Sequence, residues 1–300
     1  MGTSYLQSKN LNKRKVIKLL TLKDGRLSAV FDDSIEIYSL NNFNVELLID
    51  GGTNLRNLTQ LNNDKLIISS YYSERNKPNK VAIIAITKII SLDNNSYSIV
   101  QTLKNDYTSE KILEKDNLLF SFEQNILFDI EQTCGKSCIN IYEKSNNEYT
   151  KTKTKKDFIK IGDNNWCLFV DACFINNNEI MVVLINRIQF LDIINMEWTH
   201  EITNYYNNRQ AGRATRYEQS SQDLICNLND NLYLIGGDNK FYIIDVIRHE
   251  IQSIINLENE KIIIKNIKKD LNNKIYVLMD NNYQYMKDYY TAYDYFCVYT

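Results

Sequence analysis

The segment CGKSC, which contains Cys134 and Cys138, comes closest in spacing to a metal or redox site. A zinc site of this kind needs a second cysteine pair or two histidines at matching spacing, and the sequence has neither. We therefore expect a hairpin loop here, with Cys138 at the start of the next strand. Cys167 and Cys173 flank another apolar stretch, and their even spacing predicts that both face one side of a strand, in the core.

Acid–base chemistry near neutral pH most often uses histidine, and the chain contains only His200 and His249. We expect both histidines on outer strands, exposed to solvent. The sequence also lacks a Gly-x-Ser-x-Gly motif, a phosphate-binding glycine loop and a His-Glu-x-x-His motif. We therefore predict no catalytic residue, no bound metal and no cofactor.

Two segments are the best candidates for binding another protein, the first rich in arginine and tyrosine and the second rich in tyrosine, because these residue types are enriched at interface hot spots. They are residues 205–219 and residues 283–296. The first could instead be a solvated loop, and the second could pack over the seam between the two ends of the fold. The predicted contact residues are Tyr205, Tyr206, Arg209, Arg213, Arg216, Tyr217, Tyr285, Tyr289 and Tyr290.

A run of lysines in residues 151–160 predicts a basic edge strand. The lysines of this edge are Lys151, Lys153, Lys155 and Lys156. Strict alternation would place the first three on one face. Lysines on an edge strand prevent pairing with other sheets, and they could equally bind an acidic partner.

Composition excludes several classes of protein. The 300 residues carry a net charge of −2, which argues against a nucleic-acid-binding module, and 44% of them are hydrophobic, which is enough for a core. The N-terminus has no apolar signal region, and no apolar run approaches the ~18 residues that span a membrane. We therefore expect no membrane insertion. Six cysteines are too few for a disulfide scaffold, so we expect a cytoplasmic protein with reduced thiols. The abundant Asn, Ile, Lys and Tyr suggest an A/T-rich genome.

The elements that would carry these residues are short strands, because the apolar runs are brief and end at Asn, Asp or Gly. One turn recurs, as LKDGRL at 22–27, LNNDKL at 61–66, INNNEI at 175–180, LNDNL at 228–232 and LNNKI at 271–275. Its Asp-Gly and Asn-Asn pairs predict two-residue hairpin turns. Each turn is followed by a second hairpin, as in 26–40, 179–193 and 231–247.

The repeats predict an all-β chain folded as a single β-propeller domain, because their spacing of about 40 to 60 residues fits four-stranded blades. The six copies occupy residues 14–50, 54–104, 110–154, 158–203, 213–256 and 261–300. The last copy has only three strands, and residues 3–11 are the expected donor of its fourth. That strand would close the ring and remove two exposed sheet edges. Seven blades would result if one long copy contains two.

SAVFDDSIEIYSL, within residues 28–40, resembles the core of a WD repeat, in which a strand, an Asp turn and a strand ending in Trp-Asp succeed one another. The dipeptides at the Trp-Asp position are Tyr38-Ser39, Tyr142-Glu143, Leu191-Asp192 and Ile244-Asp245. Residues 232–245 are also similar to a kelch repeat through Gly236, Gly237 and Tyr242. The Gly-His dipeptide of WD repeats is absent, and no other copy has the double glycine.

The resemblance implies a non-enzymatic scaffold that binds partners of unknown identity through loops on one face of the ring. Two alternatives stay open. Some six-bladed hydrolases hold a metal in the central channel, where Asp171 and Glu218 would be candidate ligands. The chain could also be a structural subunit of a larger complex.

Overall fold

All regular elements of the described chain are β-strands, labelled β1 to β23, so the prediction of an all-β fold is confirmed for these residues. The structure, a computed structural model, describes residues 18–39, 44–52, 54–77, 80–93, 96–124, 137–156, 169–205, 223–237, 240–257, 262–269, 275–281 and 294–299. None of these residues forms a helix with the length and apolar character needed to cross a lipid bilayer.

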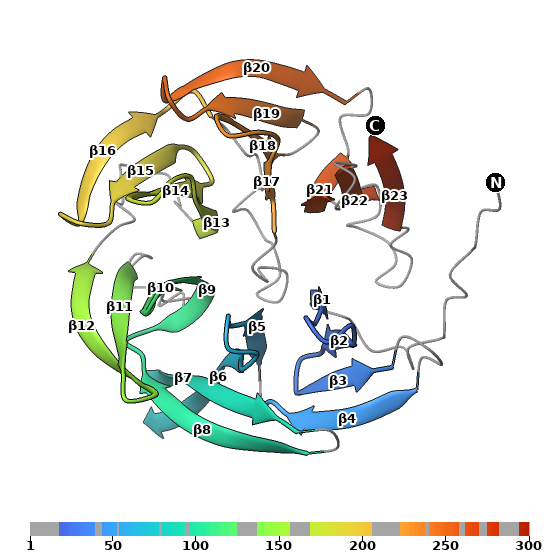
Figure 1. The fold of residues 1–300 in the computed structure, drawn as a ribbon, viewed down its shortest axis with the longest axis vertical. Coiled ribbons are helices and arrows are strands. Elements are labelled where there is room, and N and C mark those ends of the chain that lie inside the picture. The colour runs from blue at the N-terminus through green and yellow to red at the C-terminus, as the bar shows by residue number, and fades with distance from the viewer. Residues whose placement is uncertain are drawn as a thin grey trace. The chain divides into compact units, whose positions relative to one another are not determined.

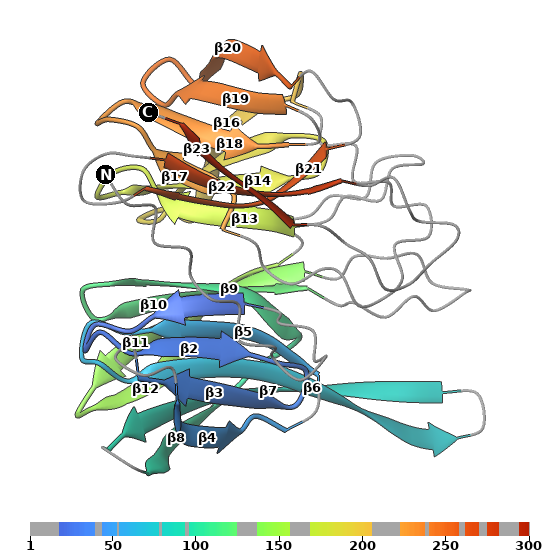
Figure 2. The ribbon, with the colours of Figure 1, turned by 90° about the vertical axis from the view of Figure 1, so that its right-hand side faces the viewer.

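The chain divides into two compact units, and the first, Met1–Ser109, contains two four-stranded antiparallel sheets (Figure 1). In both sheets each strand pairs with the next one along the chain. The strands are β1 (Lys18–Thr21), β2 (Leu27–Val30), β3 (Ser34–Tyr38), β4 (Val45–Asp50), β5 (Leu55–Gln60), β6 (Leu66–Lys77), β7 (Lys80–Leu92) and β8 (Tyr97–Lys104). β6 and β7 extend beyond their neighbours as a long hairpin (Figure 2). Val30, Ile35 and Leu58 belong to the core between the two sheets.

The second unit, Glu110–Thr300, contains three four-stranded antiparallel sheets and one three-stranded sheet. Their strands are β9 (Thr108–Lys115), which begins in the first unit, β10 (Leu118–Gln124), β11 (Ser137–Ser145), β12 (Glu148–Lys156), β13 (Phe169–Phe174), β14 (Glu179–Leu184), β15 (Ile188–Asp192), β16 (Glu197–Ile202), β17 (Ile225–Asn227), β18 (Leu232–Gly236), β19 (Lys240–Asp245), β20 (Glu250–Asn256), β21 (Ile262–Lys269), β22 (Ile275–Asn281) and β23 (Asp294–Tyr299).

The sheet β13–β16 is buried on both faces. Met181 and Val182 are neighbours in β14 and therefore point to opposite faces. Met181 belongs to the core shared with Ile244 and Val277 of the two following sheets, whereas Val182 belongs to the core shared with Phe122 of the preceding sheet. Within the second unit, apolar packing thus joins each sheet to the next.

The six sheets correspond one by one to the six predicted copies, although the third extends two residues beyond its copy at each end, and the last has three strands, as expected. The sequence repeat is therefore a repeat of sheets. The N-terminal segment 3–11, predicted to supply a fourth strand to the last sheet, lies outside the described residues. The closure of the ring and the number of blades stay predictions.

The recurring turns differ from the two-residue type that we predicted. In the first one, the backbone N–H of Leu22 donates to the carbonyl of Arg26 (2.8 Å), and the N–H of Gly25 donates to Leu22 (2.9 Å). Only the last loop residue has a positive φ, 88° at Gly25 and 64° at the equivalent Asp64. These two are three-residue loops that end in a left-handed residue, which is why glycine or aspartate stands there. The turns at 175–179 and 228–232 also enclose three residues, but none of these has a positive φ.

A β-bulge recurs between the third and fourth strands of all five four-stranded sheets. The shifts in register fall between Ile37 and Tyr38, Ile89 and Ile90, Ile141 and Tyr142, Phe190 and Leu191, and Ile243 and Ile244. In each sheet the fourth strand has one extra residue opposite this pair. The four dipeptides aligned on Trp-Asp in the sequence all begin at the second residue of such a pair, so that alignment is structurally consistent.

Candidate functional site

The first strands of the sheets in the second unit line a cavity of about 400 Å³. Its polar lining comes from four places: Lys111 on β9, Asp171 and Cys173 on β13, Asp223 just before β17 with Asn227 on that strand, and Lys269 on β21. Successive sheets therefore each place a charged group at one site. We take this cavity as the candidate functional site.

Lys111 joins three of these sheets through two ion pairs. Its Nζ lies 2.8 Å from Oδ1 of Asp171 and 2.8 Å from Oδ1 of Asp223. All three side chains are buried or nearly so, and Asp171 is only 2% exposed. Burial by itself would lower the pKa of Lys111, but the charges of Asp171 and then Asp223 outweigh this effect and raise it. Lys111 is therefore cationic at neutral pH and cannot act as a base.

Asp171 is held by backbone groups as well as by Lys111. Its Oδ2 accepts hydrogen bonds from the N–H groups of Leu224 (2.8 Å) and Ile225 (3.2 Å), at the start of the next sheet. Its Oδ1 also accepts from the N–H of Ala172 (2.8 Å). Both oxygens are thus used within the protein, which gives the carboxylate a structural task between two sheets.

Cys173 beside this cluster is not prepared for nucleophilic chemistry. Burial, and then the negative charge of Asp171, raises the pKa of the Cys173 thiol. A protonated thiol is a poor nucleophile and a poor metal ligand. Its expected companion in the strand, Cys167, lies outside the described residues. Cys138 begins β11 almost as predicted and is buried, and Cys134 lies outside the described residues.

Sequence reasoning found Asp171 but missed its partners Lys111 and Asp223. A signal for such residues exists in the first strands. Asp171, Asn57 and Asn266 each follow a β-bulge in the first strand of their sheet. Of the three, Asp171 alone is an isolated polar residue in an otherwise apolar strand, FVDACF. A bulge redirects a side chain, so a lone polar residue at this place in a repeat can mark a contact between sheets.

The predicted partner-binding residues are mostly not described. Tyr205 is the exception, and it is only 1% exposed, with its ring centroid 4.8 Å from that of Tyr242. We therefore remove Tyr205 from the predicted contact surface, because an apolar core already covers it. Tyr206, Arg209, Arg213, Arg216, Tyr217, Tyr285, Tyr289 and Tyr290 lie outside the described residues, as does Glu218.

The basic edge is the last strand of its sheet, as predicted, but its lysines do not share one face. Among the strands that the structure describes, β12 pairs with β11 alone. Lys153 lies opposite Ile141 and Lys155 opposite Ile139, on one face, whereas Lys151 lies opposite Tyr142, on the other. The extra residue of the bulge reverses the alternation between Lys151 and Lys153. Lys156 lies opposite Cys138 and shares the face of Lys151.

The two histidines also differ from the expectation of exposure. His200 is exposed on β16, but the side chain of His249, in the turn before β20, is only 16% exposed. The rings stack, with centroids 3.7 Å apart and planes inclined by 6°. The structure thus brings together the only two histidines of the chain.

Comparison with known proteins identifies the fold but no family. No protein-family description matches the chain, and no curated protein sequence matches it. Among solved structures, Hsv2 of Kluyvelomyces marxianus is similar with a TM-score of 0.52 and 10% identity, over 89% of this chain and 74% of that one. A functionally unknown protein from Desulfotomaculum acetoxidans DSM 771 gives a TM-score of 0.54 and 10% identity, over 83% and 72%. These likenesses and the four-stranded sheets are consistent with a β-propeller.

Proposed function

We propose that this chain is a β-propeller that acts as a non-enzymatic scaffold for binding other proteins. In this proposal the six sheets are six blades of a WD-like or kelch-like ring, and residues 3–11 complete the last one. Partners bind through residues 206–219, which are rich in arginine, and residues 283–290, which are rich in tyrosine.

The observation that carries the proposal is that three of the charged groups in the cavity are joined by ion pairs. Lys111 forms an ion pair with each of Asp171 and Asp223 and so ties three sheets together, and Asp171 has no oxygen left without a donor. Such a cluster stiffens a framework. It leaves Lys111 cationic and both oxygens of Asp171 occupied, so neither group is prepared to act as nucleophile, acid or base.

The alternative of a metal-dependent hydrolase gains no support from Asp171, because a metal there would have to displace Lys111 and three backbone N–H groups. The alternative of a subunit in a larger complex has one observation in its favour. Ile194 and Ile247 occupy equivalent places in the turns before β16 and β20, and they are 60% and 68% exposed. Large apolar side chains at repeated, exposed positions are suited to contact with another protein.

The test is affinity purification of the tagged chain from its native cells, with Arg209, Arg213 and Arg216 all changed to alanine. A variant with Lys65, Lys240 and Arg248 changed to alanine is the matched control, since it also loses three positive charges and leaves the basic edge intact. We expect a stoichiometric partner to be lost from the arginine variant and retained by the control variant. Retention of every partner by the arginine variant would contradict the proposed surface.

A further inference from the structure

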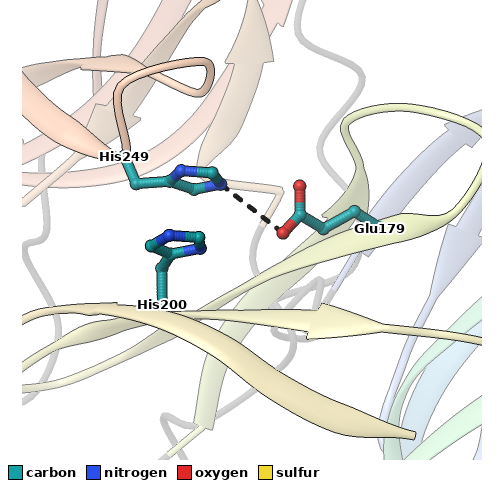
Figure 3. Close-up of side chains that lie close together, drawn as sticks. All are labelled: Glu179, His200 and His249. Atoms are coloured by element: carbon teal, nitrogen blue, oxygen red, sulfur yellow. Dashed lines mark ion pairs between the residues drawn. The ribbon is translucent and has the colours of Figure 1, made fainter. Parts of the chain in front are cut away.

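The second unit contains a cluster of three potential metal ligands away from the cavity described above. Glu179 stands at the start of β14, His200 lies on β16 of the same sheet, and His249 comes from the turn before β20 in the next sheet (Figure 3). One ligand atom of each residue lies within 4.8 Å of the others. Two imidazoles and a carboxylate form one of the common ligand sets of zinc.

The Nε2 atom of His249 is the strongest sign of a ligand. It is buried and has no hydrogen-bond partner among the described residues. Oε1 of Glu179 lies 3.5 Å away, which is an ion-pair contact but does not meet the geometry of a hydrogen bond (Figure 3). A buried imidazole nitrogen without a partner costs free energy, and a metal ion between it and the carboxylate would remove that cost.

Neighbouring groups hold Glu179 in place. The hydroxyl of Thr199 donates to Oε1 of Glu179 (2.8 Å), and the amide of Asn176 donates to Oε2 (3.4 Å). Hydrogen bonds of this kind orient the ligands of metal sites and are part of their construction. The glutamate is therefore positioned before any ion arrives.

His249 is positioned by its turn and by an aromatic neighbour. The carboxylate of Asp245 accepts hydrogen bonds from the N–H groups of Ile247 (2.9 Å) and Arg248 (3.0 Å), which fixes the turn. His249 itself has a φ of 53°. Its ring meets the ring of Phe190 edge-on, with centroids 4.5 Å apart. The imidazole is thus directed towards the sheet that carries Glu179 and His200.

The distances between the ligand atoms suit a tetrahedral zinc ion once one of the two imidazole rings tilts. Bonds of 2.0–2.1 Å to zinc place tetrahedral ligand atoms about 3.3 Å apart. The 3.5 Å between His249 and Glu179 is already close to this value. The stacked rings cannot both direct a lone pair at one ion, so one must tilt. His200 is the exposed member of the pair and can do so.

We propose that Glu179, His200 and His249 form a Zn²⁺ site that links two neighbouring sheets, with its fourth position open to water on the side of His200. This inference is independent of the proposed scaffold function. It also departs from the expectation of a metal-free chain, because the two histidines are 49 residues apart in the sequence and meet only through the packing of two sheets. Imidazole and carboxylate together favour zinc over Ca²⁺ and Mg²⁺, which prefer sites made of oxygen alone.

The test is Zn²⁺ binding to the full chain after treatment with a chelator, followed by calorimetry and by thermal unfolding. We expect one Zn²⁺ per chain and a rise in Tm with Zn²⁺, and no such rise with Ca²⁺ or Mg²⁺. The ligand variants are Glu179→Gln, His200→Ala and His249→Asn. Asparagine is chosen at 249 because it tolerates the positive φ.

We expect each ligand variant to bind Zn²⁺ at least about 100-fold more weakly, since even changes in the outer shell of a site cost 10–100-fold. Glu197→Gln is the matched control, because it removes an exposed carboxylate from the same strand as His200 and should leave binding unchanged. Tm values of all variants in chelator check that each one folds.

Two results would overturn the proposal. One is a chain that neither binds Zn²⁺ nor gains in Tm. The other is Zn²⁺ binding that survives in a variant with all three ligands changed, which would place the metal elsewhere in the chain. Co²⁺ in place of zinc then shows whether cysteines hold the metal. Thiolate ligands add a charge-transfer absorption that imidazole and carboxylate ligands do not.

Discussion

Nζ of Lys111 lies 2.8 Å from Oδ1 of Asp171, although the two residues are 60 positions apart and belong to the first strands of adjacent sheets. Lys111→Met would remove the cation and leave Asp171 and Asp223 buried without it. Because breaking a buried ion pair leaves an uncompensated charge, we expect a loss of about 3–5 kcal/mol in the free energy of unfolding. Urea denaturation of wild type and variant measures this difference.

Lys269→Met is the control for this prediction. The Nζ of Lys269 donates to the carbonyl of Leu228 (3.0 Å) at the same cavity, so its loss should cost about 1 kcal/mol. The raised pKa of Lys111 means that its contribution is fully present below the ordinary lysine value of about 10.4. The effect of Lys111→Met should therefore be equal at pH 7 and at about pH 9. A stability within 0.5 kcal/mol of wild type (about the scatter of surface changes) would refute the structural role.

Tyr149 gives a prediction for alkaline pH. Burial, and then the charge of Glu114, which accepts a hydrogen bond from the Tyr149 hydroxyl (3.4 Å), raises the pKa of Tyr149 to about 12. In the unfolded chain this hydroxyl ionises near pH 10, so its contribution is present below about pH 10 and is lost as the pH rises towards 12. Wild type should lose more stability than Tyr149→Phe above pH 10, in urea titrations at each pH. If the unfolding free energies of wild type and Tyr149→Phe fall in parallel up to about pH 11, the prediction is contradicted.

The basic edge predicts a change in aggregation. Lys153 and Lys155 lie on one face of β12, the last strand of its sheet. Replacing both with threonine removes the charges that discourage pairing of this edge, so light scattering on warming should rise faster than in wild type. Lys65→Thr with Lys240→Thr removes two charges from a turn and an inner strand, and should not have this effect.

A different outcome at the basic edge would favour the second interpretation of these lysines. If the Lys153 and Lys155 variant stays in solution as well as the wild type but loses an acidic partner, the edge is a binding surface. If it neither aggregates nor loses a partner, both interpretations fail.

Deletion of residues 3–11 tests the proposed closure of the ring. If this segment pairs with β23, its removal exposes the edge of that strand and lowers Tm, by about 2–4 °C for each kcal/mol lost. Amide exchange should speed up in β23 and stay unchanged in β12. Leu6→Pro should act in the same direction, because proline cannot donate to the strand ladder. Equal exchange in β23 with and without the segment would exclude the pairing.

Local features were predictable from the sequence and contacts between sheets were not. Turns such as that at Gly25 depend on a few neighbouring residues, so their positions are visible in the sequence, although the loop length was misjudged by one residue. The pairing of Lys111 with Asp171 and the stacking of His200 on His249 depend on how separate sheets pack. The faces of Lys151 and Lys153 were mispredicted because a bulge interrupts the alternation on which that inference relied.

The bulge between third and fourth strands also bears on construction of new proteins from this repeat. In all five four-stranded sheets the bulge follows the equivalent position of the third strand, as at Ile141 and Ile243. The extra residue therefore belongs to the repeating unit that would be copied. An averaged sequence that treats the fourth strand as strictly alternating would be one residue short there. Its outward-facing charges would then turn towards the neighbouring copy. A tandem array built from this chain must therefore keep that insertion in every copy.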